Sequence, residues 1–123
     1  MPVDWVSGAC MLVRRTAVQS VGLMDRNFFM YWEDADWCRR MREKGWQVMY
    51  FPQASLIHYA GVSSEQNLTR SVVSFHRSAL YLFDKYADSP AGVILRPVVM
   101  MGLGLRACLL LALHGIRRGI NVQ

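Results

Sequence analysis

The sequence predicts an α/β fold, in which strand-like and helical segments alternate over residues 1–88 and an apolar helical tail follows over residues 89–123. Short apolar runs bounded by glycine or proline are typical of strands, whereas apolar residues that recur every three or four positions are typical of helices. Both patterns occur before the Ser89-Pro90 dipeptide, and an almost uninterrupted apolar stretch begins after it.

The individual elements follow from these patterns and from turn residues. The expected strands and extended runs are residues 5–14, 46–51 and 54–59, and a turn is expected at residues 61–64. The expected helices are residues 16–21, 33–44 and 65–86. Gly22 and Gly45 are placed where the first two helices should end. Residues 22–32 have no helical period and are expected to form a loop that carries large aromatic side chains.

Composition and cysteine usage exclude some classes of protein. The net charge of +5 suits phosphate-bearing ligands or an anionic membrane surface. The sequence has no recognition-helix pattern, zinc-finger spacing or RNA-binding aromatic signature, so a basic nucleic-acid-binding domain is the weaker alternative. The three cysteines, Cys10, Cys38 and Cys108, form no CxxC pair, which argues against structural zinc and favours a reducing compartment. The first residues lack the pattern of a signal peptide.

Three carboxylates, Glu33, Asp34 and Asp36, lie between an aromatic cluster and a run of basic residues. On a helical wheel, Asp34 shares its stripe with uncharged residues only: Trp37, Cys38, Met41 and Gly45. Glu33 and Asp36 fall on another face, which we expect to be solvated, and Asp36 can pair there with Arg40. Asp34 is therefore the acid that points where the apolar residues point.

Two interpretations of Asp34 are open at this stage. A carboxylate at the start of a helix commonly accepts hydrogen bonds from backbone N–H groups. Alternatively, Asp34 lies at the edge of a cleft walled by Tyr31, Trp32 and Trp37, where it acts as a general base or binds polar groups of a ligand.

A series of short motifs runs from Trp5 to about Tyr86: SGA, GxxD, FFxYxED-x-D, an arginine, Gly-Trp, Pro-x-Ala, a histidine and Gly-x-Ser. This order resembles the C-terminal half of the catalytic domain of family 2 glycosyltransferases. These enzymes have the GT-A fold and invert the anomeric centre, and the nearest likeness is to bacterial rhamnosyltransferase-like members. The resemblance implies sugar transfer from a nucleotide-sugar donor to a glycan or polyprenyl-linked acceptor in cell-surface polysaccharide synthesis.

The resemblance also implies roles for individual residues. Asp34 matches the catalytic base of the family, which takes the proton of the acceptor hydroxyl. The residues expected to line the acceptor site or to support the base are Glu33, Asp36, Trp32, Ser7 and Gly8. His58 falls where some members place a ligand to the divalent metal, Mg²⁺ or Mn²⁺, that neutralises the leaving diphosphate. The family's Asp-x-Asp motif and nucleotide-binding half are missing, so we expect this chain to be a fragment and the other metal ligands to lie in that half.

Basic residues of the last expected helix raise a separate question. His76 and Arg77 are weak candidates for binding a diphosphate, because arginine grips phosphate with two parallel hydrogen bonds. Arg70 and Arg77 are seven residues apart on one face, and the sequence favours a solvated basic stripe as their explanation.

The apolar tail is interrupted by Arg96 and Arg106, and its uninterrupted runs are shorter than the ~20 residues that a membrane span needs. The sequence therefore favours an interfacial helix or a hairpin-like membrane-associated segment over a span. We expect the protein to be cytoplasmic and peripheral to the inner face of the plasma membrane. A helix docked on the chain's own core or on a dimer partner is the alternative. A non-catalytic membrane-associated fragment or interaction module is the alternative to an enzyme.

Overall fold

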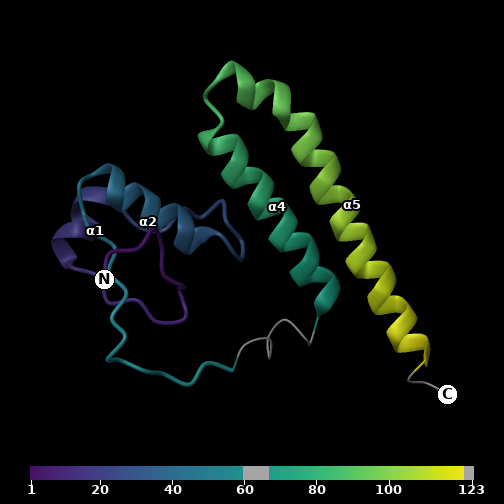
Figure 1. Cartoon of the computed structure of the whole chain (residues 1–123), viewed down its shortest axis with the longest axis horizontal. Coiled ribbons are helices and arrows are strands. Elements are labelled where there is room, and N and C mark those ends of the chain that lie inside the picture. The colour runs from purple at the N-terminus through teal and green to yellow at the C-terminus, as the bar shows by residue number, and fades with distance from the viewer. Residues whose placement is uncertain (60–66, 121–123) are drawn as a thin grey trace. The chain divides into compact units, whose positions relative to one another are not determined.

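The computed structural model describes residues 1–59 and 67–120, which belong to two compact units, Met1–Ala60 and Gly61–Gln123. The first unit holds helices α1 (Arg15–Val21) and α2 (Glu33–Glu43). The second holds α4 (Leu68–Tyr86) and α5 (Pro90–Ile120) (Figure 1).

In the first unit, α1 and α2 pack together because side chains of α2 satisfy the end of α1. The Arg40 guanidinium donates to the carbonyl oxygens of Val21 and Leu23, both at 2.9 Å. The Trp37 indole N–H donates to the carbonyl oxygen of Gly22, also at 2.9 Å. Carbonyl groups at the C-terminal end of a helix have no partner within the helix. The two α2 side chains supply partners there and fix how the helices meet.

The predicted ends of these helices are confirmed. Gly22 and Gly45 have φ angles of 83° and 81°, in the left-handed region that glycine adopts at little cost. The predicted buried stripe of α2 is confirmed as well, since Trp37, Cys38 and Met41 all belong to the core. The core of this unit is completed by Ala17, Phe28 and Val48.

The predicted strands do not form in the described part of the chain. Residues 1–3 run antiparallel to residues 48–50 through an isolated bridge between Pro2 and Met49, with a 3.0 Å hydrogen bond from Val3 N–H to the Val48 carbonyl. The other residues of the expected strands are in neither helix nor strand: residues 5–14, 46–47, 51 and 54–59. A strand needs a neighbour along its length, and these segments pair with one another only over this short stretch. The α/β class is therefore not confirmed by the described residues.

The second unit is a helical hairpin in which α4 and α5 run antiparallel (Figure 1). Each helix begins at a side-chain cap: Asn67 Oδ1 accepts from Arg70 N–H at 3.0 Å, and Ser89 Oγ accepts from Gly92 N–H at 3.2 Å. The predicted helix at residues 65–86 is confirmed from Leu68 onward, whereas its first two residues and the turn at 61–64 lie outside the described residues.

The apolar tail is one continuous helix, α5, that passes through Pro97 and Arg106. Pro90–Ile116 is long and apolar enough to cross a membrane by length and composition, and an 18-residue window within it has a mean hydropathy of 1.8 and no buried residue. The two arginines therefore do not divide the tail into separate short helices, and its expected interfacial placement stays a prediction. Arginine lowers the hydropathy of the tail, but it has a high helix propensity and does not end the helix.

Candidate active site

The N-terminal segment lies along α2 in a regular register. Its contacts are the ion pair of Asp4 with Arg42, a hydrogen bond of the Val6 backbone with Cys38, and a hydrogen bond of Gly8 N–H with Asp34. Two residues of extended chain span about 6.6 Å, and four residues of helix span about 6 Å. Every second residue of the N-terminal segment therefore meets every fourth residue of α2. The first turn of α2 is thereby held against the SGA motif.

The Asp34 carboxylate is oriented by two backbone donors. Its Oδ2 atom accepts the Gly8 N–H at 2.8 Å, and its Oδ1 atom accepts the Ala35 N–H at 2.7 Å. The side chain is half-buried. The first interpretation of Asp34, a helix-start carboxylate that binds backbone N–H groups, is therefore observed. A carboxylate has about four acceptor positions, so each oxygen can still accept a hydroxyl proton.

Backbone strain precedes the acidic pair. Tyr31 and Trp32 have φ angles of 70° and 71°, and Trp32 is the N-cap of α2. A bulky residue in the left-handed region is an outlier that costs roughly 1–3 kcal/mol, and such residues concentrate at functional sites. Sequence reasoning missed this feature because glycine and asparagine are the usual signals for that conformation.

Asp36 does not lie on a solvated face, so that expectation is wrong. Its side chain is fully buried, with 0% exposed, and accepts the Arg40 Nε–H at 2.8 Å. The predicted pair with Arg40 is confirmed. The pair holds the Arg40 guanidinium where it donates to the Val21 carbonyl at the end of α1. A helical wheel cannot show this burial because it represents the residues of one helix only.

The other predicted acceptor-site residues surround Asp34 in sequence but differ in exposure. Ser7 and Gly8 are exposed, and Ser7 Oγ accepts the Ala9 N–H at 3.3 Å. Trp32 and Glu33 are half-buried, and the Oε2 atom of Glu33 is buried with no hydrogen-bond partner in the described part of the chain.

Trp37 is a core residue rather than a wall of a cleft, because only 8% of it is exposed.

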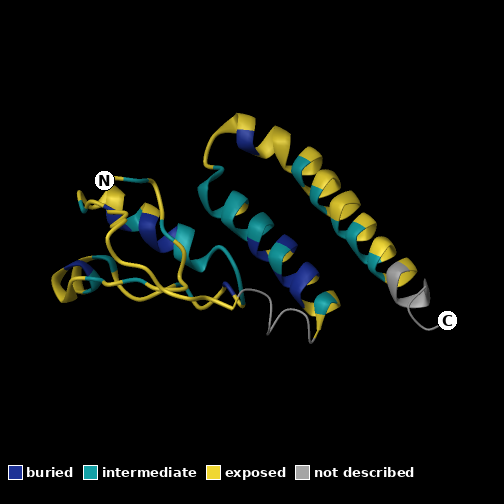
Figure 2. Cartoon of the chain, turned by 60° about the horizontal axis from the view of Figure 1, so that its bottom comes forward, coloured by how far each residue is buried: buried dark blue, intermediate teal, exposed yellow. Residues whose placement is uncertain are grey.

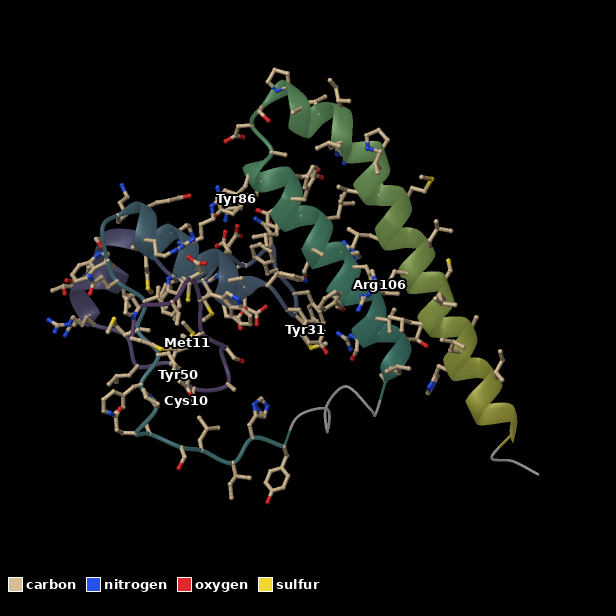
Figure 3. The ribbon with its side chains drawn as sticks, viewed as in Figure 1. Cys10, Met11, Tyr31, Tyr50, Tyr86 and Arg106 are labelled. Carbon is tan, nitrogen blue, oxygen red and sulfur yellow. The ribbon has the colours of Figure 1, made fainter. Side chains whose placement is uncertain are left out.

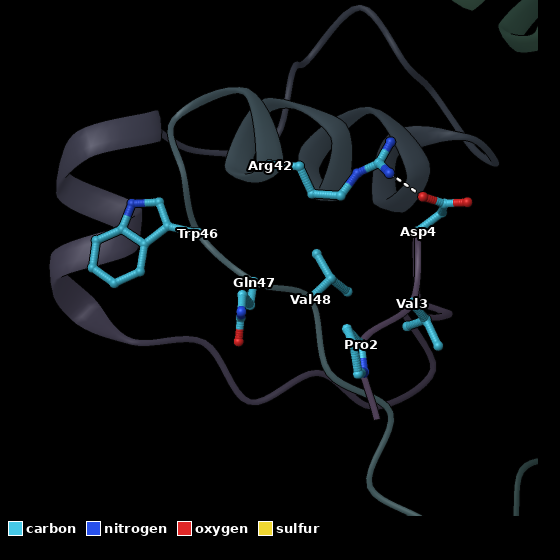
Figure 4. Close-up of a pocket in the computed structure, with 7 residues that line it drawn as sticks. All are labelled: Pro2, Val3, Asp4, Arg42, Trp46, Gln47 and Val48. Carbon is cyan, nitrogen blue, oxygen red and sulfur yellow. Dashed lines mark hydrogen bonds and ion pairs between the residues drawn. The ribbon is translucent and has the colours of Figure 1, made fainter.

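A cavity of about 370 Å³ lies at the opposite end of α2 (Figure 4). Its lining residues are Pro2, Val3, Asp4, Arg42, Trp46, Gln47 and Val48. Arg42 lies eight residues beyond Asp34, so this cavity and the Asp34 carboxylate are about two helical turns apart. The cavity is therefore not the predicted cleft beside the base.

Cys38, which the N-terminal segment contacts through the Val6 backbone, is buried. Burial raises the pKa of the Cys38 thiol, and the negative charge of Asp34 raises it further. The hydrogen bond from the Val6 backbone and the charge of Arg42 act in the opposite direction. Cys10 and Cys108 are exposed, and all three cysteines are free thiols in this structure.

The predicted metal ligand, His58, has no companion ligands in the described part of the chain, so its role stays a prediction. His58 lies exposed in the extended residues 54–59, and residues 1–59 and 67–120 hold no group of three histidine, cysteine or acidic side chains that could share an ion. Magnesium and manganese prefer several oxygen ligands in near-octahedral geometry. One exposed imidazole does not fit that requirement.

The predicted phosphate ligands also differ from expectation. His76 is buried, and its Nδ1 and Nε2 atoms lie 2.6 Å from the Val72 carbonyl oxygen and 2.9 Å from Arg106 Nη1. Both ring nitrogens are therefore engaged within the hairpin, and His76 cannot also bind phosphate. Arg77 is exposed, which suits either a phosphate ligand or the solvated basic stripe.

A comparison with protein families places these residues in context. The family described as "Glycosyltransferase like family 2" matches residues 2–84, a range that includes the whole Asp34 register and ends before α5. The chain belongs to this family. The predicted resemblance is thus confirmed, and enzymes of this family commonly use a divalent metal, whose site the described residues do not supply.

This glycosyltransferase family 2 chain is similar to curated proteins from bacteria and an archaeon. It is 37% identical over 87 residues to the N-acetylglucosaminyl-diphospho-decaprenol L-rhamnosyltransferase of Mycobacterium tuberculosis, covering 70% of this chain and 28% of the relative. It is 43% identical over 58 residues to Rhamnosyltransferase WbbL of Escherichia coli, covering 47% and 22%. It is 30% identical over 57 residues to the Low-salt glycan biosynthesis hexosyltransferase Agl10 of Haloferax volcanii, covering 46% and 19%.

The chain therefore spans less than a third of the length of each of these relatives. No solved structure shows a significant match to it.

Proposed function

We propose that this chain is the acceptor-side part, residues 1–88, of an inverting GT-A glycosyltransferase, followed by a membrane-associated extension at residues 89–123. It transfers a sugar from a nucleotide-sugar donor to a glycan or polyprenyl-linked acceptor. The observation that carries the proposal is the Asp34 carboxylate, held by Gly8 N–H at 2.8 Å and Ala35 N–H at 2.7 Å beside the strained Tyr31-Trp32 pair. The family and the rhamnosyltransferase names of two relatives support it.

In this proposal Asp34 is the general base. The acceptor hydroxyl donates a hydrogen bond to an Asp34 oxygen and passes its proton to it while the hydroxyl oxygen attacks the anomeric carbon. The bond from that carbon to the diphosphate breaks at the same time, and the electron pair leaves with the diphosphate. Attack opposite the leaving group inverts the anomeric centre. The two backbone donors keep the carboxylate from rotating, so it is already oriented when the acceptor binds.

The neighbouring residues have separate roles. Ser7, Trp32 and Glu33 line the acceptor site, and their polar groups bind the hydroxyls of the acceptor sugar. Asp36 acts as a positioning residue, because its pair with Arg40 fixes α2 against α1. No step of the proposal depends on His58 or on a metal held by this chain.

The membrane is the proposed place of action, on its cytoplasmic side. The name of the M. tuberculosis relative describes a decaprenol-linked substrate, and lipid-linked acceptors remain in the bilayer. The apolar helix α5 is compatible with contact between this chain and that surface.

Transfer can be tested in a chimera in which this chain replaces the matched 87 residues of the M. tuberculosis relative. The proposal predicts that the chimera transfers rhamnose from a nucleotide-rhamnose to the lipid-linked acceptor. A chimera that folds and binds the donor but makes no product would instead support the non-catalytic module.

A further inference from the structure

Both arginines that interrupt the apolar tail are turned toward α4. Arg96 donates to both carboxylate oxygens of Asp84, from Nε at 2.8 Å and from Nη2 at 3.1 Å. Arg106 donates from Nη1 to His76 Nε2 at 2.9 Å, and its guanidinium carbon lies 5.1 Å from the centre of the Phe75 ring (Figure 3). Because His76 Nδ1 faces the Val72 carbonyl, that nitrogen carries the proton and Nε2 is free to accept.

With Arg96 and Arg106 turned toward α4, residues 94–116 of α5 present an apolar outer face. Much of α5 is exposed (Figure 2). The side chains of this face recur at steps of three and four: Ile94 at 75%, Val98 at 58%, Met101 at 63%, Leu105 at 66%, Leu109 at 59%, Leu113 at 49% and Ile116 at 60% exposed. The α4 side of α5 carries the less exposed positions: Gly92, Val99, Leu103, Ala107, Leu110 and His114. We refer to the first set as the outer face of α5.

The contacts of Arg96 with Asp84 and of Arg106 with His76 hold α5 to α4, and they argue against α5 crossing a bilayer alone. They are ten residues apart on α5, or about 15 Å along the helix. Helix α4 carries Arg70, Arg77 and Lys85, which are costly to place in hydrocarbon. If α5 stays bound to α4, it therefore cannot cross the bilayer without moving these α4 charges into the hydrocarbon.

We propose that the α4–α5 hairpin is an in-plane membrane-binding module, which lays the outer face of α5 into the interface of an anionic bilayer. Helix α4 then stays on the water side, where Asp84 neutralises Arg96 and His76 accepts a hydrogen bond from Arg106, so that neither arginine is turned toward lipid. This deepens the membrane contact of the proposed function by giving its surface and orientation, but it holds whether or not the chain takes part in sugar transfer.

The charge of the hairpin matches that partner. Residues 67–118 contain seven basic and two acidic residues. Basic residues beside an apolar helix face draw it to anionic headgroups. The centres of protein interfaces are enriched in aromatic residues, methionine and arginine. The outer face is aliphatic apart from Met101 and has no aromatic residue or arginine. Lipid is therefore a better occupant than a second copy of the chain.

Binding can be measured by co-sedimentation of the 123-residue chain with vesicles. The proposal predicts binding to mixed phosphatidylglycerol and phosphatidylcholine vesicles that weakens with added salt, and weaker binding to phosphatidylcholine alone. Met101→Asp should lower the partition coefficient at least about tenfold, because it places a charge on the outer face. The matched control is Leu12→Asp, a fully exposed position in the first unit, which should change binding less than twofold. Equal loss in both variants, or no vesicle binding, would overturn the proposal.

Two natural cysteines report the orientation without a change to the outer face. Cys108 is exposed on α5 and Cys10 is exposed in the first unit, so both should react with a membrane-impermeant maleimide in buffer. Vesicles should protect Cys108 and leave Cys10 reactive, as measured by mass spectrometry at each site. In a Gln123→Cys variant the added thiol should still react from outside. Protection of that thiol until detergent is added would show a span, and protection of Cys108 without lipid would show self-association; either result contradicts the proposal.

Discussion

The backbone N–H of Gly8 lies 2.8 Å from Oδ2 of Asp34, and this hydrogen bond joins the SGA motif to the first turn of α2. This hydrogen bond requires the backbone N–H of residue 8, but it does not require that residue 8 be glycine. A Cβ atom at Gly8 would meet the Asp34 side chain at 3.5 Å, which is an ordinary van der Waals distance.

Substitutions at Gly8 should separate these two requirements. Gly8→Ala keeps the donor and should change the free energy of unfolding by less than about 1 kcal/mol. Gly8→Pro removes the donor to a charged acceptor and should cost about 1.5–3 kcal/mol. Urea unfolding of the two variants measures the difference. Equal stability of both would show that the hydrogen bond contributes nothing.

The buried pair of Asp36 and Arg40 should be the main electrostatic support of the first unit. Arg40→Met leaves a buried carboxylate without its cation and the carbonyl groups of Val21 and Leu23 without their donor, so it should cost about 3–5 kcal/mol. Adding Asp36→Asn should recover only part of this loss, because the carbonyl groups stay unsatisfied.

The neighbouring pair of Arg39 and Glu43 is the matched control for that experiment. It has the same i,i+4 spacing, but its side chains are 46% and 52% exposed. Arg39→Met should therefore change the free energy of unfolding by no more than about 0.5 kcal/mol. Similar losses at positions 39 and 40 would show that the Asp36 pair gains nothing from burial.

The raised pKa of Cys38 predicts a pH dependence of stability. Burial, with help from the charge of Asp34, raises the pKa of this thiol in the folded chain, so the folded state keeps its proton longer than the unfolded state does. The stabilising contribution is complete below the usual thiol pKa of about 8.5 and is lost as the pH rises through the folded-state value.

Unfolding free energies measured from neutral to alkaline pH would check this. The wild-type chain should lose stability more steeply above about pH 8.5 than Cys38→Ala, since lysine and tyrosine titrations are common to both. Parallel curves would contradict the assignment. At neutral pH, a thiol reagent should modify the exposed Cys10 well before the buried Cys38.

Features set by neighbouring residues could be predicted from the sequence. The ends of α1 and α2 follow from Gly22 and Gly45, and the buried stripe that starts at Asp34 follows from helical periodicity. The family resemblance was carried by the order of motifs and is confirmed.

Features set by distant partners could not be predicted. Asp36 is fully buried and pairs with the Arg40 guanidinium that reaches the end of α1, and the predicted strands have no continuous neighbour in the described residues. The number of arginines in the tail does not reveal that two residues of α4 bind them: Asp84 pairs with Arg96, and His76 accepts a hydrogen bond from Arg106. The strain at Tyr31 and Trp32 is likewise invisible to residue propensities.

The most direct test of Asp34 as the base is the transfer rate of the chimera with Asp34→Asn. Asparagine keeps an oxygen that can accept the Gly8 N–H but cannot take a proton, so structure and donor binding should persist while kcat falls about 10²–10⁴-fold. Asp88→Asn, which removes an exposed carboxylate in the second unit, should leave kcat unchanged. Near-full transfer by the Asp34→Asn chimera would contradict the account.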